Sequence, residues 1–434
     1  MASTNIQRQH TSAPTDNKKC TISVWVKRSA LSSSAYYGIY GGINVAWNAA
    51  GNVQIGFGSD KAYCWFKTAS GDRKKQDSTR LFRDTAWYHF VYRIDTTQST
   101  ASNRIRVYCN NEELTSWGST ADPTLNEDIS FTTNGYTNYI GKFNFTSGSV
   151  NYFSGVLSHF HLCDGYSYAP TEFGSTDATT GEWKINTSPS VSYGNNGYFI
   201  LKDGNSLTDQ SGQSNNWSSH NGTLTKTEDN PSNVFATFNP LFAYVNGGSV
   251  QRPAYSNGNN TATFDNGGLN EHAPSTLAPS SGKYYAEFKW VSSHGDGSTG
   301  VGIFATDVNT NNDINAQSYL YMGNGEKRML NSAAAYGASW TTGDIISIAL
   351  DCDNNTVTFY KNGATQGALS IASGNNYYMY CTDYDNKVVN ANFGNGYFGT
   401  TAVSSAGTNA SGIGIFEYDV PANFTALSTK GLNL

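Results

Sequence analysis

The chain has 434 residues, of which 14% are charged and 14% are aromatic, and it contains 44 glycines. This length allows two or three domains, and the composition suits short strands and turns better than helices, because aromatic residues favour pleated surfaces. A formal net charge of -6 gives no electrostatic footprint for nucleic acid, and the longest apolar stretches are too short for a membrane span. We therefore expect no nucleic-acid partner, no membrane insertion and no export signal.

Residues 1–19 are polar and show no periodicity. A segment of this kind is typical of a chain end that frays, or of an arm that becomes ordered on a neighbouring molecule. We predict a polar N-terminal arm over residues 1–19, and both interpretations stay open.

Apolar and polar residues begin to alternate at Cys20, and Cys20, Ile22, Val24 and Val26 fall on one phase. A period of two indicates a half-buried strand. Further candidate strands cover residues 38–47, 53–57, 62–67, 86–94, 104–109, 139–143 and 153–163. Because Gly, Asn and Ser turns separate these short runs, we predict an antiparallel sandwich or jelly roll over residues 20–241.

The clearest strand pair of the whole chain lies in residues 343–363. Ile346, Ile348 and Leu350 share one phase, residues 353–355 turn the chain, and residues 356–360 alternate again. Neighbouring runs at 282–290, 299–304, 376–383 and 388–393 also read as strands. We predict a second β-sandwich over residues 282–399.

Two segments lack a clear strand pattern. Residues 242–281 are rich in Asn, Gly, Ser and Pro, which is typical of a linker, although a structureless stretch of this length is unusual and part of it should pack along the sandwiches. Residues 400–434 hold too few apolar side chains for a core of their own, so we expect them to dock onto an earlier domain. The predicted fold is thus all-β, with two antiparallel sandwiches and a loop-rich connector.

The chain contains no sequence motif of a known catalytic site: there is no Walker loop, GxSxG, HExxH or kinase set. A glycoside hydrolase needs two facing carboxylates. The nearest acidic groups are Glu112–Glu113 and Glu127–Asp128, and adjacent residues of a strand point to opposite faces. We expect no catalytic residue, and a glycan depolymerase is kept only as the second alternative.

Metal and cofactor motifs are also absent from the sequence. The run from Asp351 begins like a calcium loop, but Thr356 and Asn362 stand where Gly and Glu are needed. His159 and His161 alternate along one strand and should point the same way, without further ligands. We expect no metal and no cofactor.

Six cysteines are present, at positions 20, 64, 109, 163, 352 and 381, and none forms a CxxC pair. Cys20, Cys109 and Cys352 fall in phase with apolar strand residues, which favours buried thiols. Disulfides stay open as an alternative.

Several motifs of the second half resemble the SPRY family. They are GKYYAEFKW at 282–290, VGI at 301–303, GDIISIALD at 343–351, VTFYKNG at 357–363 and ANFG at 391–394. The resemblance implies a compact β-sandwich whose loops bind partners and which carries no catalytic residue.

The first half resembles the laminin-G-like, concanavalin A-like sandwich. The motifs are SVWVKRS at 23–29, WYHFVYRID at 87–95 and FSGVLSHFHLCDG at 153–165. The succession that follows, at 168–183, 193–218 and 229–241, ahead of an SPRY-like unit, is similar to a group of bacteriophage virion proteins from marine and cyanobacterial phages. This resemblance implies a virion protein, assembled in the host cytoplasm, that contacts other virion proteins and forms a homo-oligomer in the particle.

The expected function is therefore binding. Our first hypothesis is a tail-fibre or adhesin component that recognises a host-surface glycan or protein, and the alternative is a capsid decoration or tail adaptor protein. No heptad or fibrous repeat is visible in the sequence, which favours a knob, appendage or adaptor over a complete fibre. Aromatic side chains supply large contact area at small entropic cost, and the candidate binding residues are Tyr36, Tyr37, Tyr319, Tyr321, Trp340 and Tyr384.

Overall fold

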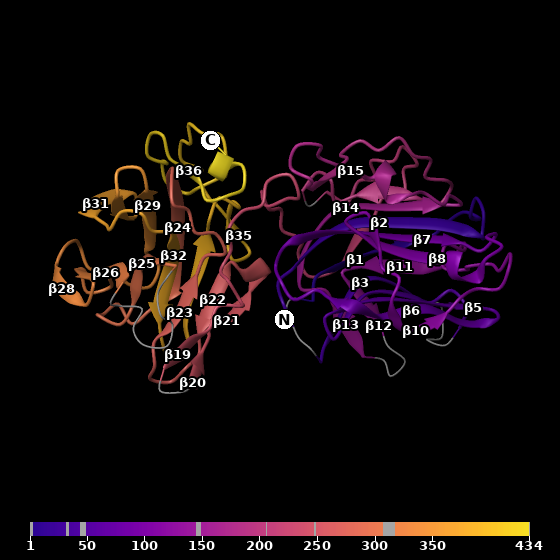
Figure 1. Cartoon of the computed structure of the whole chain (residues 1–434), viewed down its shortest axis with the longest axis horizontal. Helices are drawn as coiled ribbons and strands as arrows, with labels where there is room; N and C mark the ends of the chain where they lie inside the picture. Colours follow the sequence, from indigo (N-terminus) through magenta and orange to yellow (C-terminus); the bar gives the residue numbers. More distant parts are fainter. Residues whose placement is uncertain are drawn as a thin grey trace. The chain divides into compact units, whose positions relative to one another are not determined.

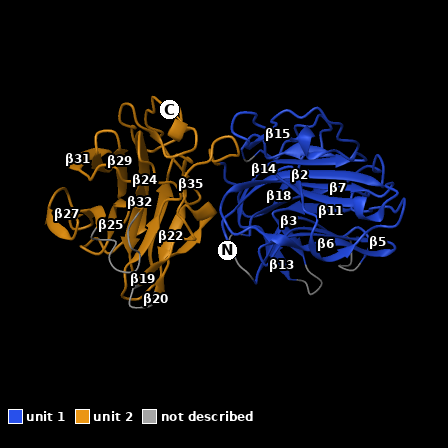
Figure 2. Cartoon of the chain, in the orientation of Figure 1, with its two compact units in different colours: residues 1–226 blue, residues 227–434 orange. Residues whose placement is uncertain are grey.

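The computed structural model describes residues 3–31, 34–43, 49–144, 149–204, 206–246, 249–306 and 317–433. The chain forms two compact units, residues 1–226 and 227–434 (Figure 2). Regular structure in the described residues consists of β-strands and of the short 3₁₀ turns η1 (Ala101–Asn103), η2 (Pro170–Glu172), η3 (Asn257–Asn259) and η5 (Gly431–Asn433). The predicted all-β class with two antiparallel sandwiches is confirmed.

Unit 1 is built from two main sheets (Figure 1). Sheet 1 contains β1 (Asn5–Gln9), β3 (Tyr36–Ile43), β4 (Val53–Gly58), β5 (Lys61–Thr68), β6 (Gly71–Leu81), β10 (Trp117–Ala121), β11 (Thr137–Ile140) and β18 (Ser218–Asn221), in the order β10-β6-β5-β4-β3-β11-β1-β18. Sheet 2 contains β2 (Lys19–Arg28), β7 (Trp87–Asp95), β8 (Ile105–Cys109), β9 (Glu112–Glu113), β14 (Gly155–Asp164) and β17 (Tyr198–Ile200), in the order β17-β14-β2-β7-β8-β9.

The core of unit 1 lies between these two sheets. Ile22 and Val24 of β2 and Ile55 and Phe57 of β4 are completely buried in it. Because successive side chains of a strand point to opposite faces, the apolar phase predicted from Cys20 onward is the phase that faces this core. Two hairpins add to the unit, β12 (Lys142–Asn144) with β13 (Val150–Tyr152) and β15 (Gly174–Thr176) with β16 (Trp183–Ile185).

The N-terminal segment differs from the polar arm predicted over residues 1–19. Residues 5–9 form β1, which pairs with both β11 and β18 inside sheet 1. Arg8 of this strand is buried and donates hydrogen bonds to His10 Nδ1 and to Asn215. The hydrophobic pattern does not reveal this strand, because Arg8 takes an inward position that usually holds an apolar side chain. Hydrogen-bond partners that are distant in sequence satisfy this buried polar residue.

The hairpin β12–β13 lies against β3, where glycines replace side chains. A Cβ atom on Gly38 would collide with the backbone of Phe143, and one on Gly41 would lie 2.7 Å from the carbonyl oxygen of Lys142. Glycine at these positions therefore lets the hairpin approach the sheet closely.

Unit 2 is a second sandwich. Sheet 3 contains β21 (Ala254–Ser256), β22 (Thr261–Phe264), β24 (Lys283–Ser292), β29 (Ile345–Asp351), β30 (Thr356–Lys361), β31 (Ala364–Ser370) and β33 (Lys387–Asn392), in the order β21-β22-β33-β24-β29-β30-β31, and β36 (Thr425–Ala426) pairs with β24. Sheet 4 contains β23 (Glu271–Pro274), β25 (Gly300–Ala305), β26 (Ser318–Met322), β27 (Glu326–Met329), β28 (Ser332–Ala335) and β32 (Tyr377–Asp383), in the order β23-β32-β25-β26-β27-β28. Two small hairpins join β19 (Tyr244–Asn246) to β20 (Ser249–Gln251) and β34 (Tyr397–Phe398) to β35 (Thr401–Ala402).

The strand pair expected at 343–363 is present as β29 and β30, with Ile348 opposite Phe359. Asn362 and Gly363 have positive φ angles of 48° and 80° and turn the chain into β31. Asn-Gly is favoured at such turns because both of its residues tolerate this conformation. The local signals of this stretch therefore match its tertiary pairing.

The segment predicted as a linker, residues 242–281, forms five short strands in the residues that the structure describes. Three of them are members of the two sheets of unit 2, β21 and β22 in sheet 3 and β23 in sheet 4. The units divide after residue 226 instead of at the predicted boundary of 241. Strands of three or four residues are too short to show a period of two. The prediction of a linker therefore depended on the amino-acid composition of the segment alone.

The segment predicted to dock over residues 400–434 packs, in its described residues 400–433, on the sandwich of unit 2. Phe416 and Val420 bury their side chains against Tyr285 and Ala349, and β36 runs parallel to β24. The completely buried carboxylate of Glu287 on β24 accepts hydrogen bonds from the backbone of this segment. The C-terminal segment thus covers the outer face of sheet 3.

Candidate binding surface

Four of the six candidate binding residues are core residues. Tyr37 belongs to the core of unit 1, and Tyr319, Tyr321 and Trp340 belong to the core of unit 2, all at most 6% exposed. Tyr319 and Tyr321 lie two residues apart on β26, so both point inward, where Tyr321 contacts Trp340 at a centroid distance of 6.0 Å. The structure therefore places these four predicted binding residues in the two cores and not at the surface.

Tyr36 is the exposed candidate of unit 1, with 38% of its surface accessible. Its ring lies edge-on to Tyr63 at 5.9 Å, and a Cβ atom on Gly58 would come within 2.5 Å of it. Glycine at position 58 thus leaves room for the Tyr36 ring on the outer face of sheet 1.

Tyr384 of unit 2 is half-buried and lies in a cluster that sequence reasoning did not find. Its ring stacks on His294 with a centroid distance of 4.3 Å and an interplanar angle of 16°. The imidazole Nδ1 of His294 lies 2.8 Å from the buried carboxylate of Asp383, which also accepts hydrogen bonds from the hydroxyl of Thr299 and the backbone N–H of Tyr384. These bonds hold the stacked pair in one orientation.

The loops that carry this cluster meet at one end of the unit 2 sandwich. Residues 293–299 join β24 to β25, and residues 384–386 join β32 to β33. The backbone N–H of Asp385 donates to the carbonyl of Asn266, and the guanidinium of Arg328 donates to the carbonyl of Gly297 at 3.1 Å. Because each loop is tied to a neighbour, the end of the sandwich is a preorganised surface, and preorganisation lowers the entropic cost of binding.

This surface combines a ring stack with acidic groups. The half-exposed carboxylate of Asp385 lies 3.9 Å from Nε2 of His294. The buried carboxylate of Asp383 lies 2.8 Å from Nδ1 of the same imidazole. Such a set can donate and accept hydrogen bonds and can contact a flat or cationic group of a partner. His294 and Asp383 are 89 residues apart, and their spacing in the sequence gives no signal of the pair.

The four carboxylates considered as candidate hydrolase residues, at positions 112, 113, 127 and 128, all form ion pairs. Glu112 pairs with Arg80 at 3.2 Å and Glu113 with Arg106 at 2.9 Å. Asp128, for its part, pairs with Lys18 at 3.2 Å.

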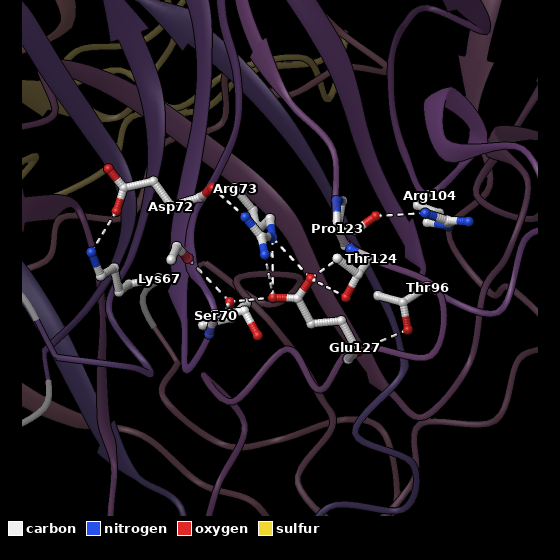
Figure 3. A network of polar contacts seen from close by, with 11 residues as sticks. Lys67, Ser70, Asp72, Arg73, Thr96, Arg104, Pro123, Thr124 and Glu127 are labelled. Atoms are coloured by element: carbon white, nitrogen blue, oxygen red, sulfur yellow. Dashed lines mark hydrogen bonds and ion pairs between the residues drawn. The ribbon is translucent and has the colours of Figure 1, made fainter.

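Glu127 is held in a wider network (Figure 3). Its carboxylate accepts from Arg73 Nε at 2.9 Å and from the backbone N–H of Thr124 at 2.6 Å, and the Thr96 hydroxyl donates to its carbonyl oxygen. Burial is the largest single influence and raises the pKa of Glu127, but the hydrogen bonds that the carboxylate accepts from Arg73, Thr68 and Thr124 together lower this pKa below its usual value. The network therefore fastens the 122–128 loop to sheet 1.

Three histidines of unit 1, His89, His159 and His161, lie in a buried aromatic layer on the outer face of sheet 2. His159 and His161 both contact Phe199, at 5.6 Å and 3.9 Å, although a register shift in β14 separates them. His89 is completely buried between Trp25 and Trp183. Burial lowers the pKa of His89 to about 3 and that of His159 to about 4, so these side chains are neutral packing residues at physiological pH.

The six cysteines are all free thiols, and five of them are buried. Burial raises the pKa of Cys64 and Cys109 to about 12. No group of three or more His, Cys, Asp or Glu side chains in the described part of the chain is arranged to hold a metal ion. The run that begins at Asp351 is a turn, in which Asp351 accepts hydrogen bonds from Asn354 and pairs with Lys283 at 2.8 Å.

Among the described residues, no helical segment has the length and apolar character needed to span a membrane.

Two family descriptions match the chain. The concanavalin A-like lectin/glucanases superfamily matches residues 2–172, and the SPRY domain matches residues 283–396. Ran-binding protein 9 of Danio rerio and of Homo sapiens is 36% identical to this chain over 118 residues, which are 26% of this chain and 20% and 16% of those proteins. The match thus spans about a fifth or less of the length of these relatives.

Two solved structures resemble parts of the chain. The SPRY domain of human HERC1 has a TM-score of 0.29 and 23% identity, covering 36% of this chain and 96% of that domain. A pentraxin from Limulus polyphemus has a TM-score of 0.34 and 14% identity, covering 52% of this chain and 89% of the pentraxin. From the family matches, the chain contains a concanavalin A-like, laminin-G-type domain followed by an SPRY domain.

Proposed function

We propose that this chain is a non-enzymatic binding protein on the exterior of a bacteriophage particle, where it recognises a host-surface glycan or protein. The observation that carries the binding role is the Tyr384–His294 stack, which buried Asp383 holds at the loop end of unit 2. The virion assignment is supported by the ordered motifs of residues 168–241 between the two domains. In this role the protein is a homo-oligomer that contacts other virion proteins.

A rigid, partly exposed aromatic pair suits recognition without chemistry. The side chain of His294 is 19% exposed and that of Asp385 is 54% exposed, so both reach the surface. Binding hot spots are enriched in aromatic side chains that are fixed before the partner arrives. The shared SPRY segment supports a protein partner for unit 2, and the lectin-like unit 1 supports a glycan.

The test uses the labelled full-length chain on host cells and on host lipopolysaccharide. We expect saturable binding and a loss of about tenfold or more in affinity for Tyr384→Ala, since truncation of a hot-spot aromatic costs 2 kcal/mol or more. Tyr36→Ala, which removes an exposed tyrosine of unit 1, is the matched comparison and should keep the affinity for a protein receptor. Release of reducing ends from host polysaccharide would contradict the non-enzymatic role.

A structural role in the particle, as a capsid decoration or tail adaptor, is the second candidate. It is favoured by β28 at the edge of sheet 4, whose four residues are all exposed and uncharged. Natural edge strands commonly carry charges or proline that prevent pairing, as β23 at the other edge does with Glu271 and Pro274. Absence of binding to host cells, together with density for the chain between other proteins of an intact particle, would select this role.

A further inference from the structure

Lys142 of β12 is an ammonium group without an acidic partner. The residue is only 7% exposed, and its Nζ lies 3.9 Å from the centroid of the Tyr139 ring. No carboxylate of the described residues lies within ion-pair distance of this nitrogen, whereas Lys67 and Lys75 of the same unit pair with Asp72 and Asp122 at 2.8 Å and 2.7 Å. A desolvated charge is costly unless it is paired, so a missing counter-ion needs an explanation.

One further group, the imidazole of His220, contacts the same Tyr139 ring. Tyr139 lies on β11 between the buried residues Asn138 and Ile140, so its side chain points to the outer face of sheet 1. His220 of β18 contacts the edge of the Tyr139 ring at 5.1 Å with an interplanar angle of 76°, and it is exposed. An ammonium, an imidazole and a phenol hydroxyl therefore gather at one place on the surface of unit 1.

The surrounding strands are free of acidic residues. Residues 1–15, 17–59, 129–163 and 210–227 contain no Asp or Glu, and they supply the five adjacent strands β4, β3, β11, β1 and β18 together with the hairpin β12–β13. An anion that approaches Lys142 along these strands meets no carboxylate. Burial lowers the pKa of Lys142, and burial followed by the nearby Lys142 charge lowers that of His220, as expected where no negative group compensates.

We propose that Lys142, Tyr139 and His220 form a binding site for the anionic group of an acidic saccharide. The anionic group supplies the counter-ion that the fold omits. Lysine offers three donors as a point charge, and charge-assisted hydrogen bonds are about twice as strong as neutral ones. That the anion is part of a saccharide rests on the proposed function, in which unit 1 recognises a host glycan; a uronate carboxylate and a sugar phosphate are the two sources of this chemistry.

The test measures binding to the full-length chain by calorimetry at low salt. The probes are oligogalacturonate, a neutral dextran oligomer and inorganic phosphate. We expect oligogalacturonate or phosphate to bind and the dextran oligomer not to bind. Lys142→Gln should lower the affinity for the anion by about tenfold or more, which corresponds to the loss of one hydrogen bond to a charged group. Lys142→Arg should retain part of the affinity.

Lys67→Gln is the matched control, because that lysine already has a carboxylate partner, and it should bind as the wild type does. Equal affinity of Lys142→Gln and wild type, equal binding of dextran and oligogalacturonate, or binding of neither anion would each overturn the proposal. If the variant fails to fold, NMR titration of the wild-type chain decides: the pKa of Lys142 must rise when the anion binds, and an unchanged pKa refutes the site.

This outcome is separable from the proposed function. In one outcome the wild type binds neither anion, while host-cell binding persists in Lys142→Gln. That result would refute the anion site and leave host recognition intact. In the other outcome the chain binds the anion but does not bind host cells. That result would refute host recognition and leave the anion site intact.

Discussion

The carboxylate of Glu287 connects the C-terminal segment to sheet 3 and makes the stability of unit 2 depend on pH. One oxygen, Oε2, accepts hydrogen bonds from the backbone N–H of Glu417 at 2.8 Å and from Asn392 Nδ2 at 3.3 Å. The other, Oε1, accepts from the backbone N–H of Tyr418 at 2.9 Å and from the Tyr285 hydroxyl at 3.3 Å. No cation of the described residues forms an ion pair with this carboxylate.

Burial outweighs these four hydrogen bonds and raises the pKa of Glu287 from 4.5 to about 7. A raised pKa means that the folded state prefers the protonated carboxyl group. The resulting stabilisation is complete below pH 4.5 and is lost as the pH rises through 7, for a total of about 3 kcal/mol. The titratable groups that interact with this carboxyl are the phenols of Tyr285 and Tyr418.

Glu287→Gln removes this titration and places an amide NH₂ against a backbone N–H donor, which leaves one buried donor unsatisfied. We expect a loss of about 1–3 kcal/mol in the free energy of unfolding at pH 5. At pH 8 the difference between variant and wild type should be smaller by about 2–3 kcal/mol, because only the wild type bears the cost of burying a charge there.

Hydrogen exchange of the peptide that covers residues 413–420 measures this effect in the full-length chain. Glu417→Gln is the control, since the Glu417 carboxylate bonds to exposed Ser404 instead of the core, and it should keep the wild-type pH dependence. An equal difference between Glu287→Gln and wild type at pH 5 and pH 8 would refute the reasoning.

Two further predictions concern unit 1. Asp60→Ala should lower the free energy of unfolding by about 3–5 kcal/mol in urea titrations. The reason is that the completely buried guanidinium of Arg28, which lies 2.9 Å from Asp60, would lose its acidic partner. A change below about 1 kcal/mol would contradict this. Gly38→Ala should destabilise the unit by about 1–3 kcal/mol, because its Cβ collides with the backbone of Phe143. Gly267→Ala, where a Cβ meets open space, is the control, and equal melting temperatures for both alanine variants would count against the argument.

Local sequence patterns were sufficient for the architecture. The alternation of Ile346, Ile348 and Leu350 and the turn at Asn362–Gly363 predict strands that the structure places in β29 and at the end of β30. A period of two and the demands of a tight turn involve only neighbouring residues, so these features are readable without the fold.

Short or polar strands were missed for an equally physical reason. In β1, the inward position of Arg8 is compensated by Asn215, more than two hundred residues away. In β22 and β23, four residues each are too few to establish a phase. What stabilises such strands is their pairing with distant strands, and that pairing is a property of the folded chain.

The class of structure, the number of sandwiches and most of the strands were predictable from sequence, because alternating side chains and turn residues act over a few positions. Which aromatic rings are buried became clear only in the folded protein, since the face of a strand that is covered depends on the opposite sheet. Tertiary structure also brings Tyr384 to His294 and Tyr139 to His220, because those contacts join loops and strands that are far apart along the chain.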